Sequence, residues 1–153
     1  MRPKKDQASP TLLLHRASKL VFRDMEAAFS DSSFRYSQWV ALSLIDENHA
    51  RTVSAVADCM GYYPRAATRL LDRLERDGLL TRVRDARDRR MVHVRLTKAG
   101  RTAVERGRPL VERRWSSLLF DCTDSEIGQF IKVLRSASAH AASLLAPGLR
   151  RVS

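Results

Sequence analysis

The fold of this chain is decided by one stretch, Asp85-Ala86-Arg87-Asp88-Arg89-Arg90-Met91-Val92-His93-Val94-Arg95-Leu96-Thr97. An arginine-rich turn is followed by a segment in which apolar and polar residues alternate, the pattern of a half-buried strand. Thr97 then provides an N-cap for a helix. Leu79 to Arg84 alternates in the same way before the turn. The two segments therefore predict a β-hairpin whose tip holds several guanidinium groups out into water, which indicates a polyanionic partner.

Two short helices are predicted immediately before this hairpin. Thr52 is the expected N-cap of a helix over Val53 to Met60, and Gly61 supplies a turn that favours positive φ. Pro64 lies near the first turn of the second helix, which ends at an Asp77-Gly78 C-cap. Helix, turn, helix and basic hairpin, in this order, are typical of a winged helix that grips DNA.

Four further helices are predicted from apolar periodicity and capping residues. Ser9, with its hydroxyl as N-cap, and Pro10 open a helix through about Phe29; a second runs from about Tyr36 to Glu47. A long helix capped by Thr97 reaches about Leu119, with an interruption and a bend expected at Gly107-Arg108-Pro109. The capping box Thr123-Asp124-Ser125-Glu126 opens the last helix, which Pro147-Gly148 stops.

The predicted fold class is mainly α with a small β-hairpin wing: a winged helix-turn-helix with N- and C-terminal dimerisation helices. We expect residues 1–153 to form a single domain, with about 36–100 as the DNA-binding lobe and about 9–30 and 101–147 as dimerisation helices. A monomer of this length covers only part of the apolar stripes on the terminal helices. A homodimer would bury them, and its two-fold symmetry would suit a palindromic DNA site. The alternative is that both helices pack within one chain.

The charge balance narrows the classes of partner. The chain has 28 Lys and Arg against 17 Asp and Glu, a formal net charge of +11. Such a field attracts nucleic acid or an anionic membrane, and a merely soluble basic protein is the alternative on composition alone. No apolar run approaches the ~20 residues that span a bilayer. The N-terminus lacks the apolar core of a signal peptide, so we expect a cytoplasmic protein and no membrane partner.

The residue types that carry enzyme chemistry form no recognisable pattern. Cys59 and Cys122 are far apart, and none of the four histidines lies beside a nucleophile or at metal-ligand spacing. There is also no glycine-rich phosphate loop. We therefore expect no catalysis, no metal and no cofactor. Cys59, in an apolar helical stretch, is expected to fill the core, and a redox role for either cysteine stays open.

The second helix of the predicted motif supplies the candidate base contacts. A major groove about 12 Å wide accepts one helix, and the residues of its first turns reach base edges. Arg65, Thr68 and Arg69 lie in those turns, and an arginine can hold guanine O6 and N7 together. Tyr62 and Tyr63, at the preceding turn, can donate hydrogen bonds to phosphate.

The hairpin tip is predicted to make a different contact. Arg87, Arg89 and Arg90 cannot all pair with Asp85 and Asp88, so at least one guanidinium remains for an outside partner. A slim arginine-bearing turn fits a narrow minor groove, where the potential is most negative. Asp88 is expected to brace the turn by pairing with a neighbouring arginine.

Arginines on the predicted strands have a third expected role. Arg82, Arg84 and Arg95 should reach backbone phosphates, which position a protein without reading sequence. A non-specific, DNA-coating architectural protein would explain the charge equally well and is the alternative function. The ratio of affinities for a palindromic fragment and a random duplex separates the two.

The segment Thr52 to Thr97 resembles the winged helix-turn-helix of the MarR family of bacterial transcriptional regulators. The resemblance is carried by Thr68-Arg69-Leu70-Leu71-Asp72-Arg73-Leu74-Glu75-Arg76-Asp77-Gly78-Leu79, by Asp88-Arg89-Arg90 and by Leu96-Thr97-Lys98-Ala99-Gly100. Gln38-Trp39-Val40-Ala41-Leu42 also resembles the family's second helix. The resemblance implies an obligate homodimer joined through its terminal helices and bound to a pseudo-palindrome in or near a promoter, in most cases as a repressor.

The resemblance also implies a small-molecule effector, often an aromatic acid or a phenolic compound, that changes the spacing of the two DNA-reading lobes. In relatives the pocket lies near the first, second and fifth helices. Here His15, Arg16, Lys19 and Trp39 offer cations and an aromatic wall that suit an aromatic carboxylate. The alternative is a solvated stripe of cations and a core tryptophan. Relatives that sense oxidants use a cysteine near the start of the first helix, and its absence here argues against peroxide sensing.

Overall fold

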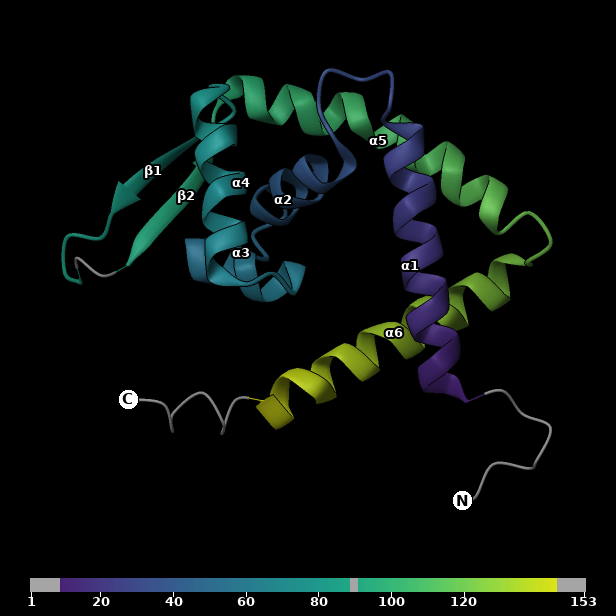
Figure 1. Ribbon diagram of the computed structural model, residues 1–153. Coiled ribbons are helices and arrows are strands. Elements are labelled where there is room, and N and C mark those ends of the chain that lie inside the picture. Colours follow the sequence, from purple (N-terminus) through teal and green to yellow (C-terminus); the bar gives the residue numbers. More distant parts are fainter. Residues whose placement is uncertain (1–8, 89–90, 146–153) are drawn as a thin grey trace. The chain divides into compact units, whose positions relative to one another are not determined.

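The computed structural model describes residues 9–88 and 91–145, and these form six helices and one two-stranded antiparallel hairpin (Figure 1). The predicted fold class is confirmed. Arg89, Arg90 and the predicted helix stop at Pro147-Gly148 lie outside the described residues. In chain order the elements are α1 (Pro10–Ala28), α2 (Tyr36–Asp46), α3 (Val53–Met60), α4 (Pro64–Arg76), β1 (Leu80–Arg84), β2 (Val92–Leu96), α5 (Lys98–Leu118) and α6 (Asp124–Leu145).

The chain divides into two compact units, one ending at Arg114 and the other beginning at Trp115. The first unit contains α1 to α4, the hairpin and most of α5. Its core is built from α2, α3, α4, the hairpin and the start of α5. The buried residues of this core are Ala41, Leu42, Ile45, Ala50, Val56, Leu71, Leu74, Leu80, Val94, Ala103 and Val104.

Local sequence signals place the helices of this unit where expected. The Thr52 hydroxyl accepts a hydrogen bond from the Ala55 amide (3.2 Å), so Thr52 is the N-cap of α3. Gly61 ends α3 with φ 63°, and Gly78 follows α4 with φ 73°. Both backbones are in the left-handed region that glycine adopts without steric cost. The two helices of the motif are thereby held at a fixed turn.

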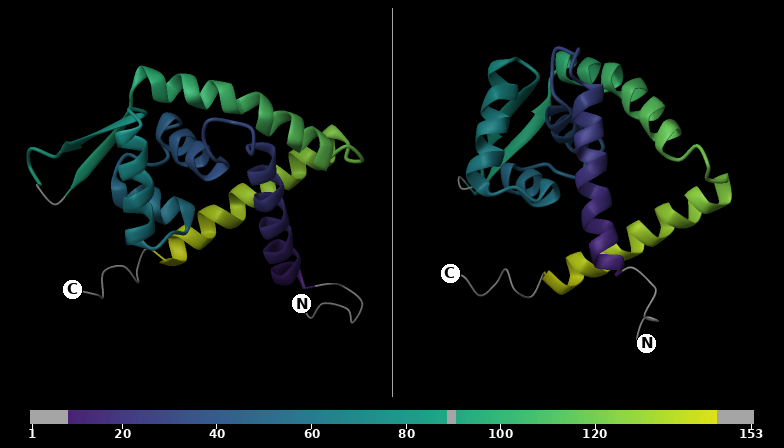
Figure 2. Two further views of the ribbon diagram at one scale, coloured as in Figure 1. Left: turned by 45° about the horizontal axis from the view of Figure 1, so that its top comes forward. Right: turned by 45° about the vertical axis from the view of Figure 1, so that its right-hand side comes forward.

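The hairpin is attached to the helical core through its second strand. β1 and β2 pair from Leu80 opposite Leu96 to Arg84 opposite Val92. The Val94 amide also donates to the Arg51 carbonyl (3.0 Å), which adds a short backbone edge to β2. Figure 2 shows the hairpin extending beyond α4. Its base is thus anchored on both sides while its tip projects.

An aromatic cluster joins α1, α2 and α5 within the first unit. Trp39 of α2 stacks on Tyr36 (ring centroids 6.0 Å apart, interplanar angle 15°) and packs against Phe29, which follows α1 (6.2 Å). Its indole N–H donates to the Val104 carbonyl of α5 (3.0 Å). The indole also lies directly against Gly107, where an added Cβ would come within 2.1 Å of Trp39 Cδ1. This contact requires glycine at position 107.

Three expectations about local structure are wrong. The Ser9 hydroxyl makes no capping hydrogen bond; Pro10, which has no N–H, already removes one unpaired donor from the first turn of α1. α5 continues through Pro109, so the interruption expected there is wrong, while the expected bend stays a prediction. Cys59 is exposed rather than in the core, because the buried face of α3 is formed by Val56 and Ala57.

Among the helices of residues 9–88 and 91–145, not one combines the length and apolar character that a bilayer span requires.

The close packing of Trp39 on α5 generates a stability prediction. Gly107→Ala should destabilise the fold by about 1–3 kcal/mol, because overpacking forces the indole or the helix to shift. Thermal unfolding measures this as a melting temperature lower by several degrees. Gly128→Ala is the matched control: α6 has open space at this position, and alanine favours a helix by up to ~1 kcal/mol. A Gly107→Ala protein as stable as Gly128→Ala would contradict the packing.

Candidate nucleic-acid interface

α4 has one buried face and one cationic face. Ala67, Leu71 and Leu74 are fully buried and fix the rotation of the helix about its axis. Arg65 and Arg69 are exposed on the other side. With Pro64 at its first position, the helix begins at the turn after α3, so both arginines lie in its first two turns. The structure therefore presents the two candidate base-reading arginines to solvent from a rigid helix.

The other candidates on this side are hydroxyl groups. Thr68 is exposed, and its hydroxyl donates to the Pro64 carbonyl (2.9 Å) one turn earlier, leaving its oxygen as an acceptor. Tyr63 is 87% exposed at the N-cap of α4. Tyr62 is half-buried, and burial together with the Glu26 carboxylate raises the pKa of its hydroxyl. Tyr62 therefore stays protonated and keeps a donor available.

The turn of the hairpin is organised by Asp85. Its carboxylate accepts hydrogen bonds from the backbone amides of Arg87 (2.7 Å) and Asp88 (3.0 Å). The other carboxylate oxygen lies 2.8 Å from Nε2 of His93 on β2. These bonds, with the backbone amide of Asp88 as the largest cause, lower the pKa of Asp85 to about 2. Asp85 is thus an anionic brace of the turn, a role that sequence reasoning missed. An aspartate whose carboxylate accepts a hydrogen bond from the amide two residues later is nevertheless a common turn signal.

The arginines of the hairpin divide into two groups. Arg84, Arg87 and Arg95 are exposed, consistent with outside contacts. Arg82 is only 20% exposed and bonds to Asp72 of α4 at 2.6 Å, which argues against its expected role as a phosphate contact. The sequence could not reveal this pairing because it depends on how the hairpin packs on α4.

A concave surface of about 610 Å³ lies between α3, α4 and the hairpin. Its lining includes the hydroxyls of Thr52 and Ser54 and the guanidinium of Arg84. Hydroxyl and guanidinium donors are the groups that most often contact phosphate oxygens. The helix, the hairpin and the surface between them can therefore contact one continuous polyanion.

The four candidate effector-binding residues are not brought into one described cluster. His15, Arg16 and Lys19 are exposed on α1. Trp39 is half-buried, and its only N–H is already bonded to Val104. Trp39 is therefore part of the packing between α2 and α5, and effector binding by these four residues remains a prediction.

Comparison with known proteins agrees with this geometry. Residues 33–91 match the model of the MarR family. The HTH-type transcriptional regulator YkoM of Bacillus subtilis strain 168, itself uncharacterized, is 24% identical over 144 residues, which cover 92% of this chain and 94% of YkoM. A MarR-family transcriptional regulator from Rhodococcus sp. RHA1 is 25% identical with a TM-score of 0.75, over 83% of this chain and 90% of that one. BpsR of Bordetella bronchiseptica, whose DNA binding is regulated by 6-hydroxynicotinic acid, is 26% identical with a TM-score of 0.71, over 84% and 97%.

The Asp85 brace generates a local prediction that depends on pH. Asp85→Ala should lower the hydrogen-exchange protection factors of the Arg87 and Asp88 amides, because both lose their acceptor. In the unchanged protein this protection should be complete above pH 4. It should decline as the pH falls toward 2, because a carboxyl with a lowered folded-state pKa stabilises only while it is ionised. Equal protection in the variant, or protection independent of pH across this window, would contradict the brace.

Proposed function

Because residues 33–91 match the model of the MarR family, we propose that the chain belongs to this family and is a sequence-specific DNA-binding transcriptional regulator and not an enzyme. It acts in the cytoplasm as a homodimer on a pseudo-palindromic promoter site, as a ligand-responsive repressor. One observation carries the proposal: α4 buries Ala67, Leu71 and Leu74 and exposes Arg65 and Arg69 beside a projecting basic hairpin.

The exposed faces of these elements suit the two grooves of a duplex. A helix with arginines in its first turns enters the major groove and pairs with guanine O6 and N7. The hairpin tip, with Arg87 exposed, reaches the neighbouring minor groove, where negative potential attracts guanidinium. Arg89 and Arg90 extend this contact in the proposal. Tyr62, Tyr63, Arg84 and Arg95 hold phosphates and set the register.

Each terminal helix, considered by itself, exposes apolar side chains that support dimerisation. Leu12, Leu13 and Leu14 of α1 are 64%, 53% and 59% exposed. In α6, Val133 is 64% exposed, and none of the residues from 124 to 144 is buried. Apolar side chains so exposed on two long helices mark a surface that a second copy covers. Two-fold symmetry then presents two copies of α4 about 34 Å apart, one turn of DNA.

The effector in this proposal is an aromatic carboxylate or a phenolic compound. BpsR, whose DNA binding responds to 6-hydroxynicotinic acid, supports this class of ligand. His15, Arg16 and Lys19 supply cations for the carboxylate, and Trp39 supplies an aromatic wall. An effector that binds more tightly when the two DNA-binding lobes are at a different separation shifts the dimer toward that state. DNA is then released although the effector does not contact it, because the difference in effector affinity between the two states shifts the equilibrium.

The proposal is tested by asking whether arginines of α4 recognise individual bases. Arg65→Ala and Arg69→Ala should each relax sequence preference at one base pair of each half-site, costing about 1–3 kcal/mol there. The measurement is affinity for a duplex selected by the unchanged protein from a randomised library, compared with single-base variants and with a scrambled duplex at fixed salt.

Arg76→Ala is the matched control, because it removes the same charge from the far end of the same helix. It should change affinity for all duplexes alike. If the unchanged protein binds the selected and scrambled duplexes equally, the chain is a non-specific DNA-coating protein. If Arg65→Ala and Arg69→Ala lose affinity uniformly, neither residue reads a base.

A further inference from the structure

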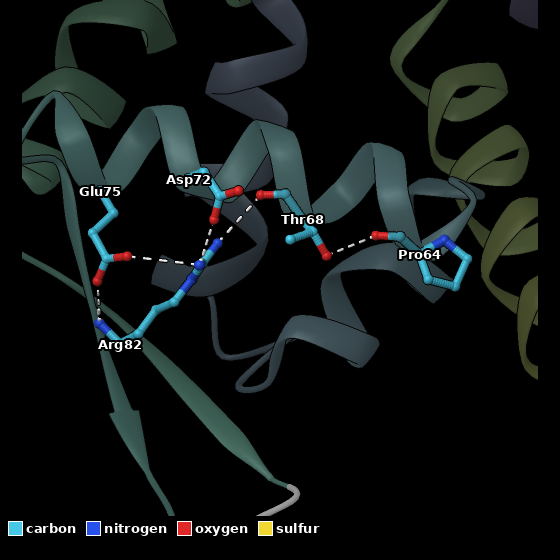
Figure 3. Close-up of polar contacts among 5 residues, drawn as sticks. All are labelled: Pro64, Thr68, Asp72, Glu75 and Arg82. Carbon is cyan, nitrogen blue, oxygen red and sulfur yellow. Dashed lines mark hydrogen bonds and ion pairs between the residues drawn. The ribbon is translucent and has the colours of Figure 1, made fainter.

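Arg82, in the middle of β1, connects the hairpin to α4. Arg82 reaches from the strand to Thr68, Asp72 and Glu75, which lie along about two turns of the helix (Figure 3). Its Nη1 donates to Asp72 Oδ1 at 2.6 Å and lies 3.7 Å from Glu75 Oε2, and its Nη2 donates to the Thr68 carbonyl at 3.3 Å. Its backbone amide donates to Glu75 Oε1 at 3.1 Å. One residue therefore joins the two elements at four points.

The spacing of the partners makes this arrangement specific to arginine. Residues 68, 72 and 75 are four and three positions apart, so they form one stripe along α4. A planar guanidinium can bond to a carboxylate and to a neighbouring carbonyl at once, whereas an ammonium is a single compact charge. The Nε of Arg82 is buried with no acceptor among the described residues, so the side chain is oriented by its two terminal nitrogens.

The same contact has an electrostatic effect at the DNA-facing helix. Asp72 and Glu75 keep 45% and 41% of their side chains exposed. Two carboxylates on a helix that approaches phosphates would repel them, and the guanidinium of Arg82 beside them offsets part of their charge. Arg82 is then occupied within the protein and is not a ligand for a phosphate.

We propose that Arg82 is a positioning residue that fixes the hairpin to α4 at one angle, so that the helix and the wing enter neighbouring grooves as one rigid unit. This inference rests on the proposed function for its consequence on DNA, but the fixed angle is a property of the free protein. Loss of the contact widens the range of angles between the two elements. Specific DNA, which must satisfy both grooves together, loses more affinity than random DNA.

The first test uses variants whose charge effects have opposite signs. Arg82→Gln removes a cation, and Asp72→Ala removes an anion; simple attraction to DNA predicts weaker binding for the first and tighter binding for the second. We expect both to lower the affinity ratio between the library-selected and scrambled duplexes by about tenfold, the equivalent of one mismatched base pair. Asp77→Ala is the control, because it removes one negative charge at the end of α4. Among the described residues, the Asp77 carboxylate pairs with Arg73 at 3.8 Å and not with Arg82, so this variant should leave the affinity ratio unchanged.

Salt dependence separates positioning from direct contact. If Arg82 held a phosphate, Arg82→Gln would reduce the slope of log affinity against log salt on random duplex by about one. We expect no change in this slope. A reduced slope, or an unchanged affinity ratio in variants that melt as the wild type does, overturns the proposal.

The second test needs no DNA and holds even if the proposed function fails. Residual dipolar couplings of the backbone amides report the orientation of the hairpin relative to α4. One alignment tensor should fit both elements in the wild type and in Asp77→Ala, while Asp72→Ala should require a reduced tensor for the hairpin. A single tensor of full magnitude in Asp72→Ala would show that the contact does not set the angle.

Discussion

The geometry that we propose to face DNA depends on one constraint, the complete burial of Ala67, Leu71 and Leu74 along one side of α4. Each buried leucine contributes about 1.5–3 kcal/mol, more than the ~0–1 kcal/mol of an exposed ion pair. Rotating the helix by one residue turns it through about 100°, which would move arginines toward the core. The apolar stripe therefore decides that Arg65 and Arg69 face outward, and no charged contact of their own is needed to place them.

The hairpin is positioned by contacts of a different kind. Val94 and Leu80 bury its base in the same core, Arg82 bonds it to α4, and Asp85 holds its turn. Each of these polar groups is used inside the protein, while the exposed arginines near them are directed to solvent. The 28 Lys and Arg therefore include both cations that build the lobe and cations that can meet DNA. The Trp39 contact with α5 connects this lobe to the helices proposed to form the dimer.

Several features specified by neighbouring residues, although not the Ser9 cap or an interruption at Pro109, could be predicted from the sequence. The cap at Thr52 and the turns at Gly61 and Gly78 follow from residues one to three positions apart, and all are present. Features that depend on packing between elements could not be predicted. Arg82 and Asp72 are ten residues apart and meet only because the hairpin folds back on α4. The exposure of Cys59 likewise depends on which face of α3 the core covers, since apolar neighbours in sequence do not specify that face.

The central claim is that a dimer inserts α4 into the major groove and the wing into the minor groove of one duplex. Dimethyl sulfate footprinting on the library-selected duplex tests it directly, because guanine N7 lies in the major groove and adenine N3 in the minor groove. We expect two clusters of protected guanine N7 about one helical turn apart, each flanked by protected adenine N3. Guanine N7 that stays reactive throughout the bound site, or a single cluster, would contradict it.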